Sequence, residues 1–122
     1  MIKGVGTDIL RVSRMDGFVE KHGDTGIVFT PSEREYILSR NGFSSVTAAG
    51  IFTAKEAVLK ALGTGLQGFK MTDIEISRDE NGRPFVIKRG KLLEMHPGAA
   101  FHLSISHDGD YAAAFAVMEE DL

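Results

Sequence analysis

The feature that most constrains the fold of this chain is one long helical pattern, expected from residue 44 to about residue 62. Gly63 or Gly65 would end it, because glycine is the usual residue at the left-handed position that follows a helix. The apolar positions of the pattern recur on one side at about 100° per residue. We expect this core face to consist of Thr47, Gly50, Ile51, Ala54, Val58, Ala61 and Leu62.

The other apolar segments are patterned as strands. The expected strands cover residues 2–10, 72–79, 84–89, 100–107 and 111–118. Asn81-Gly82 and Asp108-Gly109 separate the last four into two pairs, and such dipeptides favour tight turns between antiparallel strands. One long helix must then lie across an antiparallel-rich sheet. This arrangement predicts an α+β fold.

Shorter helices are expected on both sides of the long one. Ser13 is a candidate N-cap for a short helix within residues 11–23. Thr30 and Glu33 have the spacing of a capping box, which predicts a helix start at that point. Residues 90–97 have a short helical pattern. No linker, repeat or low-complexity tract divides the 122 residues, so we expect a single domain over residues 1–122.

Composition excludes several classes of function. The net charge of −3, the pI near 5.8 and the lack of tryptophan argue against a general nucleic-acid binder. No apolar run approaches the roughly 20 residues that span a bilayer, and the first residues do not read as a signal peptide. The lack of cysteine excludes disulfides and thiolate metal sites. We expect a cytoplasmic protein that binds neither membranes nor nucleic acid.

The long helix carries Glu56 and Lys60 one turn apart, away from its core face. This spacing is also that of an ordinary solvent-facing pair, which contributes only about 0.3–0.5 kcal/mol. The Gly63-Thr64-Gly65 segment that follows lacks the Lys-Ser/Thr of a Walker A loop. It fits a helix end at least as well as a phosphate cradle.

An acidic residue lies in the first strand. Alternation places Gly4, Gly6 and Asp8 on one face of that strand. A buried and unpaired carboxylate would be costly, and two glycines leave room for a bulky group beside the backbone. Asp8 could instead end an edge strand and cap the turn that follows. Near the C-terminus, His107 ends a strand immediately before a turn, where histidine is often only a structural residue.

Two carboxylates and a lysine without histidine or cysteine partners suit a hard cation. Mg²⁺ usually takes one or two carboxylates and leaves its other positions to water and substrate phosphate. Lys60 would then provide a mobile positive charge for a phosphate group. Together, Asp8, Glu56 and Lys60 predict chemistry on a phosphate ester or anhydride.

Five stretches resemble a known family in their order and separation. They are GVGTDILRVSR at 4–14, FTPSE at 29–33, FTAKEAVLKALGTG at 52–65, TDIEISRDENGRPFV at 72–86 and HLSISHDGDYAAAFAV at 102–117. Over nearly the whole chain they look like the holo-[acyl-carrier-protein] synthase family of phosphopantetheinyl transferases. The resemblance implies that family's fold. It also implies Mg²⁺-dependent transfer of 4′-phosphopantetheine from coenzyme A to a serine of apo acyl carrier protein, releasing adenosine 3′,5′-bisphosphate.

The resemblance also implies roles for individual residues. Asp8 and Glu56 match the metal-binding carboxylates, and Lys60 matches the lysine beside the pyrophosphate. The coenzyme site would further include Gly63, Gly65, Pro84 and His107, with His107 among the catalytic residues. Arg14 matches a basic residue that meets the acidic carrier protein, and Arg11 and Lys21 would extend that patch. The serine proton would leave to Lys60, a carboxylate or water on the metal.

Members of the family with one small domain form homotrimers with active sites at subunit interfaces, so the resemblance implies a trimer. The pattern of residues 111–118 gives a second reason, because both faces of this strand are apolar and the long helix can cover only one. We expect the face with Ala112, Ala114 and Ala116 to be the one that another subunit covers.

One departure and two alternative functions stand beside this interpretation. Relatives usually have a basic residue just before the FTPSE-like segment, where this chain has residues 24–28 without one. This difference concerns the carrier-protein contact more than the metal site. A Mg²⁺-dependent pyrophosphohydrolase could use the same three residues with water as its nucleophile. A coenzyme A-binding module without turnover is the non-enzymatic alternative.

Overall fold

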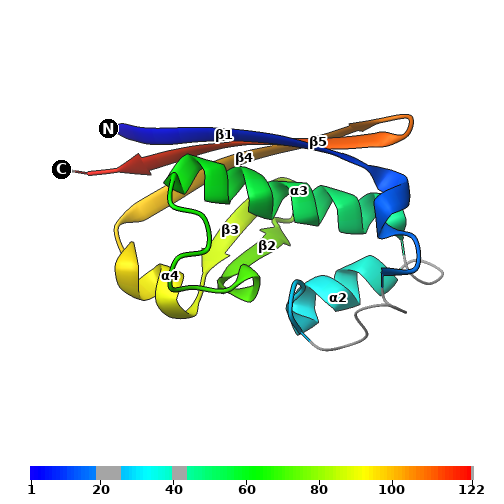
Figure 1. The fold of residues 1–122 in the computed structure, drawn as a ribbon, viewed down its shortest axis with the longest axis horizontal. Helices are drawn as coiled ribbons and strands as arrows, with labels where there is room; N and C mark the ends of the chain where they lie inside the picture. Colours follow the sequence, from blue (N-terminus) through cyan, green and yellow to red (C-terminus); the bar gives the residue numbers. More distant parts are fainter. Residues whose placement is uncertain (19–25, 40–43, 122) are drawn as a thin grey trace.

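The computed structural model describes residues 1–18, 26–39 and 44–121 of the chain. In this part of the chain, the longer strands come first and last, and the helices and a short hairpin lie between them (Figure 1). The elements are β1 (Ile2–Arg11), η1 (Val12–Met15), α2 (Pro31–Leu38), α3 (Ser45–Leu62), η2 (Met71–Asp73), β2 (Ile74–Arg78), β3 (Pro84–Lys88), α4 (Gly90–Met95), β4 (Ala99–Asp108) and β5 (Tyr111–Glu120).

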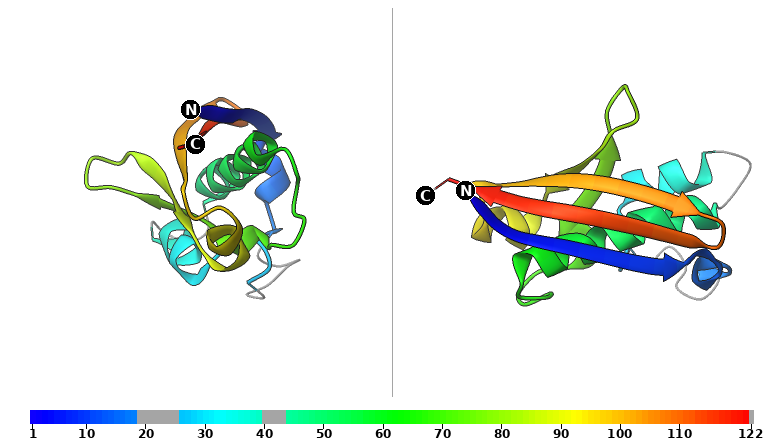
Figure 2. Two further views of the ribbon diagram at one scale, coloured as in Figure 1. Left: turned by 90° about the vertical axis from the view of Figure 1, so that its left-hand side faces the viewer. Right: turned by 90° about the horizontal axis from the view of Figure 1, so that it is seen from above.

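Two antiparallel sheets pack around α3. The larger sheet has the strand order β1-β5-β4, and the smaller one is the β2–β3 hairpin. Figure 2 shows the three long strands side by side over α3, with β5 in the middle, and the hairpin on another side of the helix. The predicted α+β class, with an antiparallel sheet on one long helix, is confirmed.

The ends of α2 and α3 follow the local signals in the sequence. The Thr30 hydroxyl accepts from the backbone N–H of Glu33 at 3.2 Å, and the Glu33 carboxylate accepts from the N–H of Thr30 at 2.8 Å, so the capping box is present. At the other end of α3, Gly63 adopts φ 79° and its N–H donates to Leu59. Of the two expected helix-ending glycines, Gly63 is the C-cap. Where a short helix capped by Ser13 is expected within residues 11–23, Val12–Met15 form the 3-10 turn η1, which contains Ser13 and has Arg11 at its N-cap; residues 19–23 lie outside the described residues.

The glycines of β1 allow α3 to pack closely against the strand. A Cβ atom on Gly4 would lie 1.9 Å from the carbonyl oxygen of Ala61, and one on Gly6 would lie 2.0 Å from that of Ala57. Both distances are far inside van der Waals contact. The bulky group that the two glycines admit is therefore the backbone of α3 in the same chain.

The face of β5 that α3 covers is the alanine face, which corrects the sequence-based expectation. Ala114 is buried and Ala116 is 0% exposed, whereas Phe115 on the opposite face is 46% exposed. A helix can approach a strand closely only over small side chains, so the alanines lie beneath α3. The opposite face of the sheet carries the larger, exposed residues Val5, Ile9, Tyr111 and Phe115, and we call it the outer face.

None of the helices within residues 1–18, 26–39 and 44–121 is both long enough and apolar enough to cross a membrane.

Candidate active site

Asp8, Glu56 and Lys60 come together between β1 and α3. The Lys60 ammonium group lies 3.1 Å from Oδ1 of Asp8 and donates to the backbone carbonyl of Thr7 at 2.9 Å. Alternation along β1 turns Asp8 toward α3, as predicted, and Gly6 lets the turn with Lys60 approach. Lys60 therefore forms hydrogen bonds to β1. It is not simply the partner of Glu56 in a solvent-facing pair on the helix.

The two carboxylates of this cluster repel each other. Burial raises the pKa of Glu56 above its ordinary value, and the negative charge of Asp8 raises it further, while Lys60 acts in the opposite direction. With one cation for two acids, the cluster has an excess of negative charge when both carboxylates are ionised. A positive ion placed between the two acids would relieve the repulsion.

The two carboxylates fit a metal ion whose remaining ligands come from the substrate and water. In the part of the chain that the structure describes, no three His, Cys, Asp or Glu side chains gather into a cage for a metal. Two carboxylates from different elements are nevertheless what Mg²⁺ ordinarily takes from a protein when phosphate and water fill its other positions. Asp8 and Glu56 are the residues that would hold it.

The loop after α3 begins beside this cluster. Gly63 follows Lys60 by less than one turn, and both Gly63 and Gly65 have positive φ values, 79° and 65°. A Cβ atom on either residue would meet nothing within 4 Å, so the backbone there is open to solvent. A ligand extending from Lys60 along the loop would find exposed backbone without side chains in the way.

The other two residues assigned to the coenzyme site lie elsewhere in the subunit. His107 is exposed at the end of β4 and pairs in register with Ala112 of β5, so two strand spacings separate it from β1. Pro84 begins β3 in the smaller sheet. Within one chain, the structure does not bring either residue to the cluster of Asp8, Glu56 and Lys60.

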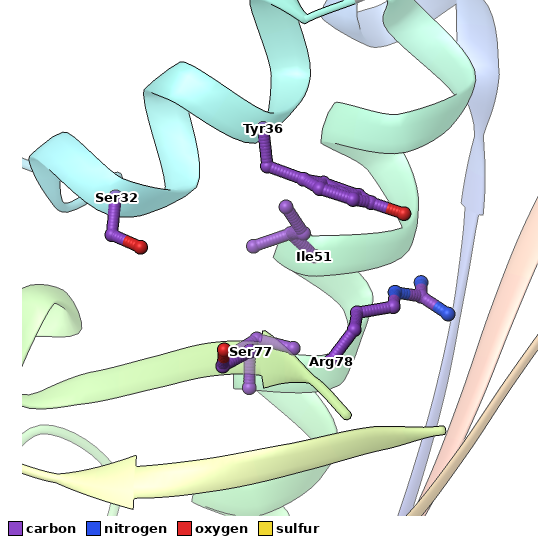
Figure 3. Close-up of a pocket in the computed structure, with 6 residues that line it drawn as sticks. Ser32, Tyr36, Ile51, Ser77 and Arg78 are labelled. Carbon is purple, nitrogen blue, oxygen red and sulfur yellow. The ribbon is translucent and has the colours of Figure 1, made fainter. Parts of the chain in front are cut away.

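A pocket of about 230 Å³ opens on a different side of α3 (Figure 3). The guanidinium of Arg78 lies 5.8 Å from the centre of the Tyr36 ring at this pocket. Ile51, which α3 contributes to its wall, lies about 140° around the helix from Glu56 at 100° per residue. Its lining residues are Ser32, Tyr36, Ile51, Ile76, Ser77 and Arg78.

Comparison with known proteins identifies the family. The sequence profile of the 4'-phosphopantetheinyl transferase superfamily matches residues 4–116. The chain belongs to this superfamily. It is 45% identical to the holo-[acyl-carrier-protein] synthase of Clostridium kluyveri over 99% of this chain and 92% of that protein. It is 39% identical to the Fusobacterium nucleatum enzyme of the same name, over 97% and 99% of the two chains.

Solved structures of superfamily members agree with this assignment. The holo-(acyl-carrier-protein) synthase of Bacillus anthracis, crystallised with coenzyme A (3',5'-ADP), superimposes with a TM-score of 0.82 at 34% identity, over 99% of both chains. The Helicobacter pylori synthase in complex with coenzyme A gives a TM-score of 0.80 at 27% identity, over 94% of this chain and 99% of that one. The phosphopantetheinyl transferase fold expected from the sequence is confirmed.

Two of the three residues expected to meet the carrier protein, Arg11 and Arg14, lie at one end of the larger sheet. Arg14 is exposed on η1. Arg11 donates to the hydroxyl of Tyr111 at 2.9 Å, and its guanidinium lies 5.2 Å from the centre of that ring. Arg11 is thus held against β5, whereas Lys21 lies outside the described residues.

Sequence reasoning missed a buried ion pair in this superfamily member. Lys55 and Glu33 are both fully buried, with 2.7 Å between Nζ and Oε1. Burial raises the pKa of Glu33 and lowers the pKa of Lys55, and the attraction within the pair opposes both shifts. One signal was present: Lys55 lies only about 40° around the helix from Ile51 on the core face. A lysine at that position has to find a buried partner.

Proposed function

We propose that this chain transfers the 4′-phosphopantetheine group of coenzyme A to a serine of apo acyl carrier protein. The observation that carries the proposal is the meeting of Asp8, Glu56 and Lys60 in one cluster, in a chain 45% identical to a holo-[acyl-carrier-protein] synthase. The serine oxygen would attack the phosphorus that bears pantetheine. The bond from this phosphorus to the oxygen it shares with the other phosphate would break, and the serine proton would leave. The products are holo acyl carrier protein and adenosine 3′,5′-bisphosphate.

The cluster supports this reaction by balancing charge. The pyrophosphate of coenzyme A is negative, and negative charge moves to the leaving phosphate as the bond breaks. Mg²⁺ held by Asp8 and Glu56 would neutralise part of that charge. The Lys60 ammonium group already contacts Asp8 and the carbonyl of Thr7, so it lies beside the first carboxylate before substrate arrives. It can contact a phosphate oxygen without a large movement.

We propose that the complete active site lies between subunits of a homotrimer. Asp8, Glu56, Lys60 and the loop that starts at Gly63 form one part of it. His107 and Pro84, on β4 and β3, would come from a neighbouring subunit, because they lie away from the cluster in their own chain. The outer face supports assembly as well, since Ile9 on it is 65% exposed. An apolar sheet face of this kind is normally covered.

Mass spectrometry of apo acyl carrier protein with coenzyme A and Mg²⁺ tests the transfer directly. Transfer adds about 340 Da to the carrier protein, the mass of the group carried by the coenzyme. Consumption of coenzyme A without carrier protein, and with no mass gain when it is present, would indicate the pyrophosphohydrolase instead. Binding of coenzyme A without either reaction would indicate a module that does not turn over.

The remaining assignments follow from the transfer. Acyl carrier protein as the acceptor implies a place in fatty acid biosynthesis, and we propose that the reaction takes place in the cytoplasm. We also propose that residues 1–122 act as one phosphopantetheinyl transferase domain, with Arg14, Arg11 and Lys21 at the carrier-protein contact.

A further inference from the structure

The buried ammonium group of Lys55 bonds to three separate parts of the chain. Besides the carboxylate of Glu33 on α2, it donates to the backbone carbonyl of Val28 and to that of Met71 at 3.1 Å. An ammonium group has three protons to donate, so these partners use all of them. The carboxylate is equally well satisfied, because Glu33 also accepts from the backbone N–H groups of Thr30 and Ile76.

The position of Lys55 relates these bonds to the candidate active site. Lys55 directly precedes Glu56, and the two side chains point in directions about 100° apart around α3. Its bond to Met71 fixes the far end of the loop that begins at Gly63, and its bond to Val28 fixes the segment before α2. One side chain thus connects the turn with Glu56 to two neighbouring segments of backbone.

The rotation of α3 is set from two sides. On one side the backbone of β1 contacts the helix at Gly4 and Gly6. On another side Lys55 is bonded to two carbonyls and a carboxylate. A buried ion pair is a weak source of stability, since two apolar side chains of similar size often stabilise a fold equally well. Apolar residues would not reproduce the hydrogen bonds from Lys55 to the backbone carbonyls of Val28 and Met71.

We propose that Lys55 is a positioning residue for the transfer reaction. Through its bonds to Val28 and Met71 it holds Glu56 in its orientation toward Asp8 and fixes the far end, at Met71, of the loop that begins at Gly63, along which the coenzyme phosphates would lie. The inference rests on the proposed function. It gives the buried pair of Lys55 and Glu33 a role in orienting the active-site residues, in addition to any contribution to stability.

The test replaces both buried charges together, Glu33→Gln with Lys55→Met, so that neither is left alone in the core. The control makes the same two kinds of change, Glu94→Gln with Lys91→Met, at an exposed ion pair within α4 whose Nζ and Oε2 atoms lie 3.4 Å apart. The readouts are the melting temperature, kcat at saturating coenzyme A, and the affinity for coenzyme A by calorimetry. All are measured on the full chain well below the melting temperature of each variant.

The expected result is a fall of about tenfold to 100-fold in kcat, or a similar loss of coenzyme A affinity, in the variant of Glu33 and Lys55 only, because a small misplacement of reacting groups has effects of that size. The same losses in the variant of Glu94 and Lys91, or unchanged values in both variants, would overturn the inference. If circular dichroism finds the variant of Glu33 and Lys55 unfolded, Glu33→Gln with Lys55→Gln decides, because two amides leave no charge alone in the core and can still form hydrogen bonds. Glutamine is shorter than lysine and cannot reproduce both carbonyl bonds, so kcat should again fall about tenfold, and a value within about twofold of wild type would overturn the role of those bonds. A wild-type protein without transfer would contradict the proposed function, which is a different outcome.

Discussion

At the scale of single residues, the main question is which side chains carry chemistry and which only hold the fold. Asp8 and Glu56 come from different elements, and the negative charge of Asp8 contributes to the raised pKa of Glu56. Lys60 is bonded to Asp8, but its side chain is largely exposed, and exposed ion pairs contribute little to stability. The cluster therefore contributes little to folding, which is consistent with its proposed role in binding and catalysis.

Asp8→Asn and Glu56→Gln should each reduce transfer at least 1,000-fold with little change in melting temperature. Neutralisation of charge at a phosphoryl centre is worth several kcal/mol, and about 1.4 kcal/mol corresponds to tenfold in rate. Mass spectrometry of the carrier protein gives the rate, and a thermal melt gives the stability. Near-normal transfer by either variant at low Mg²⁺ would contradict the assignment of the metal ligands.

Arg14→Ala should weaken the binding of acyl carrier protein and leave the affinity for coenzyme A unchanged. An exposed arginine that meets an acidic partner mainly affects association and its dependence on salt. Calorimetry with each substrate separates the two effects. A loss confined to coenzyme A would move Arg14 into the nucleotide site.

At the scale of elements, the contact of β1 with α3 decides how the site forms. Gly4 and Gly6 bring the strand against the backbone of the helix, and this contact brings Asp8 to Lys60. The elements themselves follow from local signals, such as the capping box at Thr30 and the C-cap at Gly63. Their separation in space depends on the size of the side chains between them.

Gly6→Ala should destabilise the protein by about 3 kcal/mol, since an added methyl group would force β1 and α3 apart. The melting temperature should fall by roughly 10 °C or more for a domain of this size, and transfer should fall with it. Gly98→Ala is the matched control, because the nearest atom to its added Cβ would be a side-chain oxygen of Glu120 at 3.9 Å. Equal melting temperatures for the two variants would show that the close contact is unimportant.

At the scale of the whole molecule, the exposed side of the larger sheet is the prominent feature. The outer face carries Val5, Ile9, Tyr111 and Phe115, while the alanines on the other face of β5 lie under α3. A charge at Ala114 or Ala116 is therefore expected to unfold the subunit, not only to separate subunits. The proper probe of assembly is a residue of the outer face.

If the protein is the proposed homotrimer, Phe115→Glu should convert it to monomers and abolish transfer, because the proposed site needs two subunits and a charge on the outer face prevents their contact. Light scattering across micromolar concentrations, with circular dichroism as a check of folding, measures the assembly. Leu93→Glu, at an equally exposed leucine of α4 (47% against 46%), should stay trimeric and active. A wild-type protein that is an active monomer would contradict both the trimer and the shared site.

The sequence by itself determined the elements and the face of β1 on which Asp8 lies. Helix caps, turns and the alternation of a strand depend on residues within a few positions of one another, so they can be read along the chain. The order and separation of five stretches that resemble the family likewise indicated the family, and with it the residues Glu56 and Lys60 of the candidate site.

Only the tertiary structure decided which groups meet across the core. Local periodicity shows that both faces of β5 are apolar, but the size of its alanines decides that α3 lies on them. Similarly, Lys55 and Glu33 are 22 positions apart, and no local pattern in the sequence links them. Their pairing depends on how α2, α3 and β2 pack together, because burial removes water and leaves each charge only the groups that the fold brings to it.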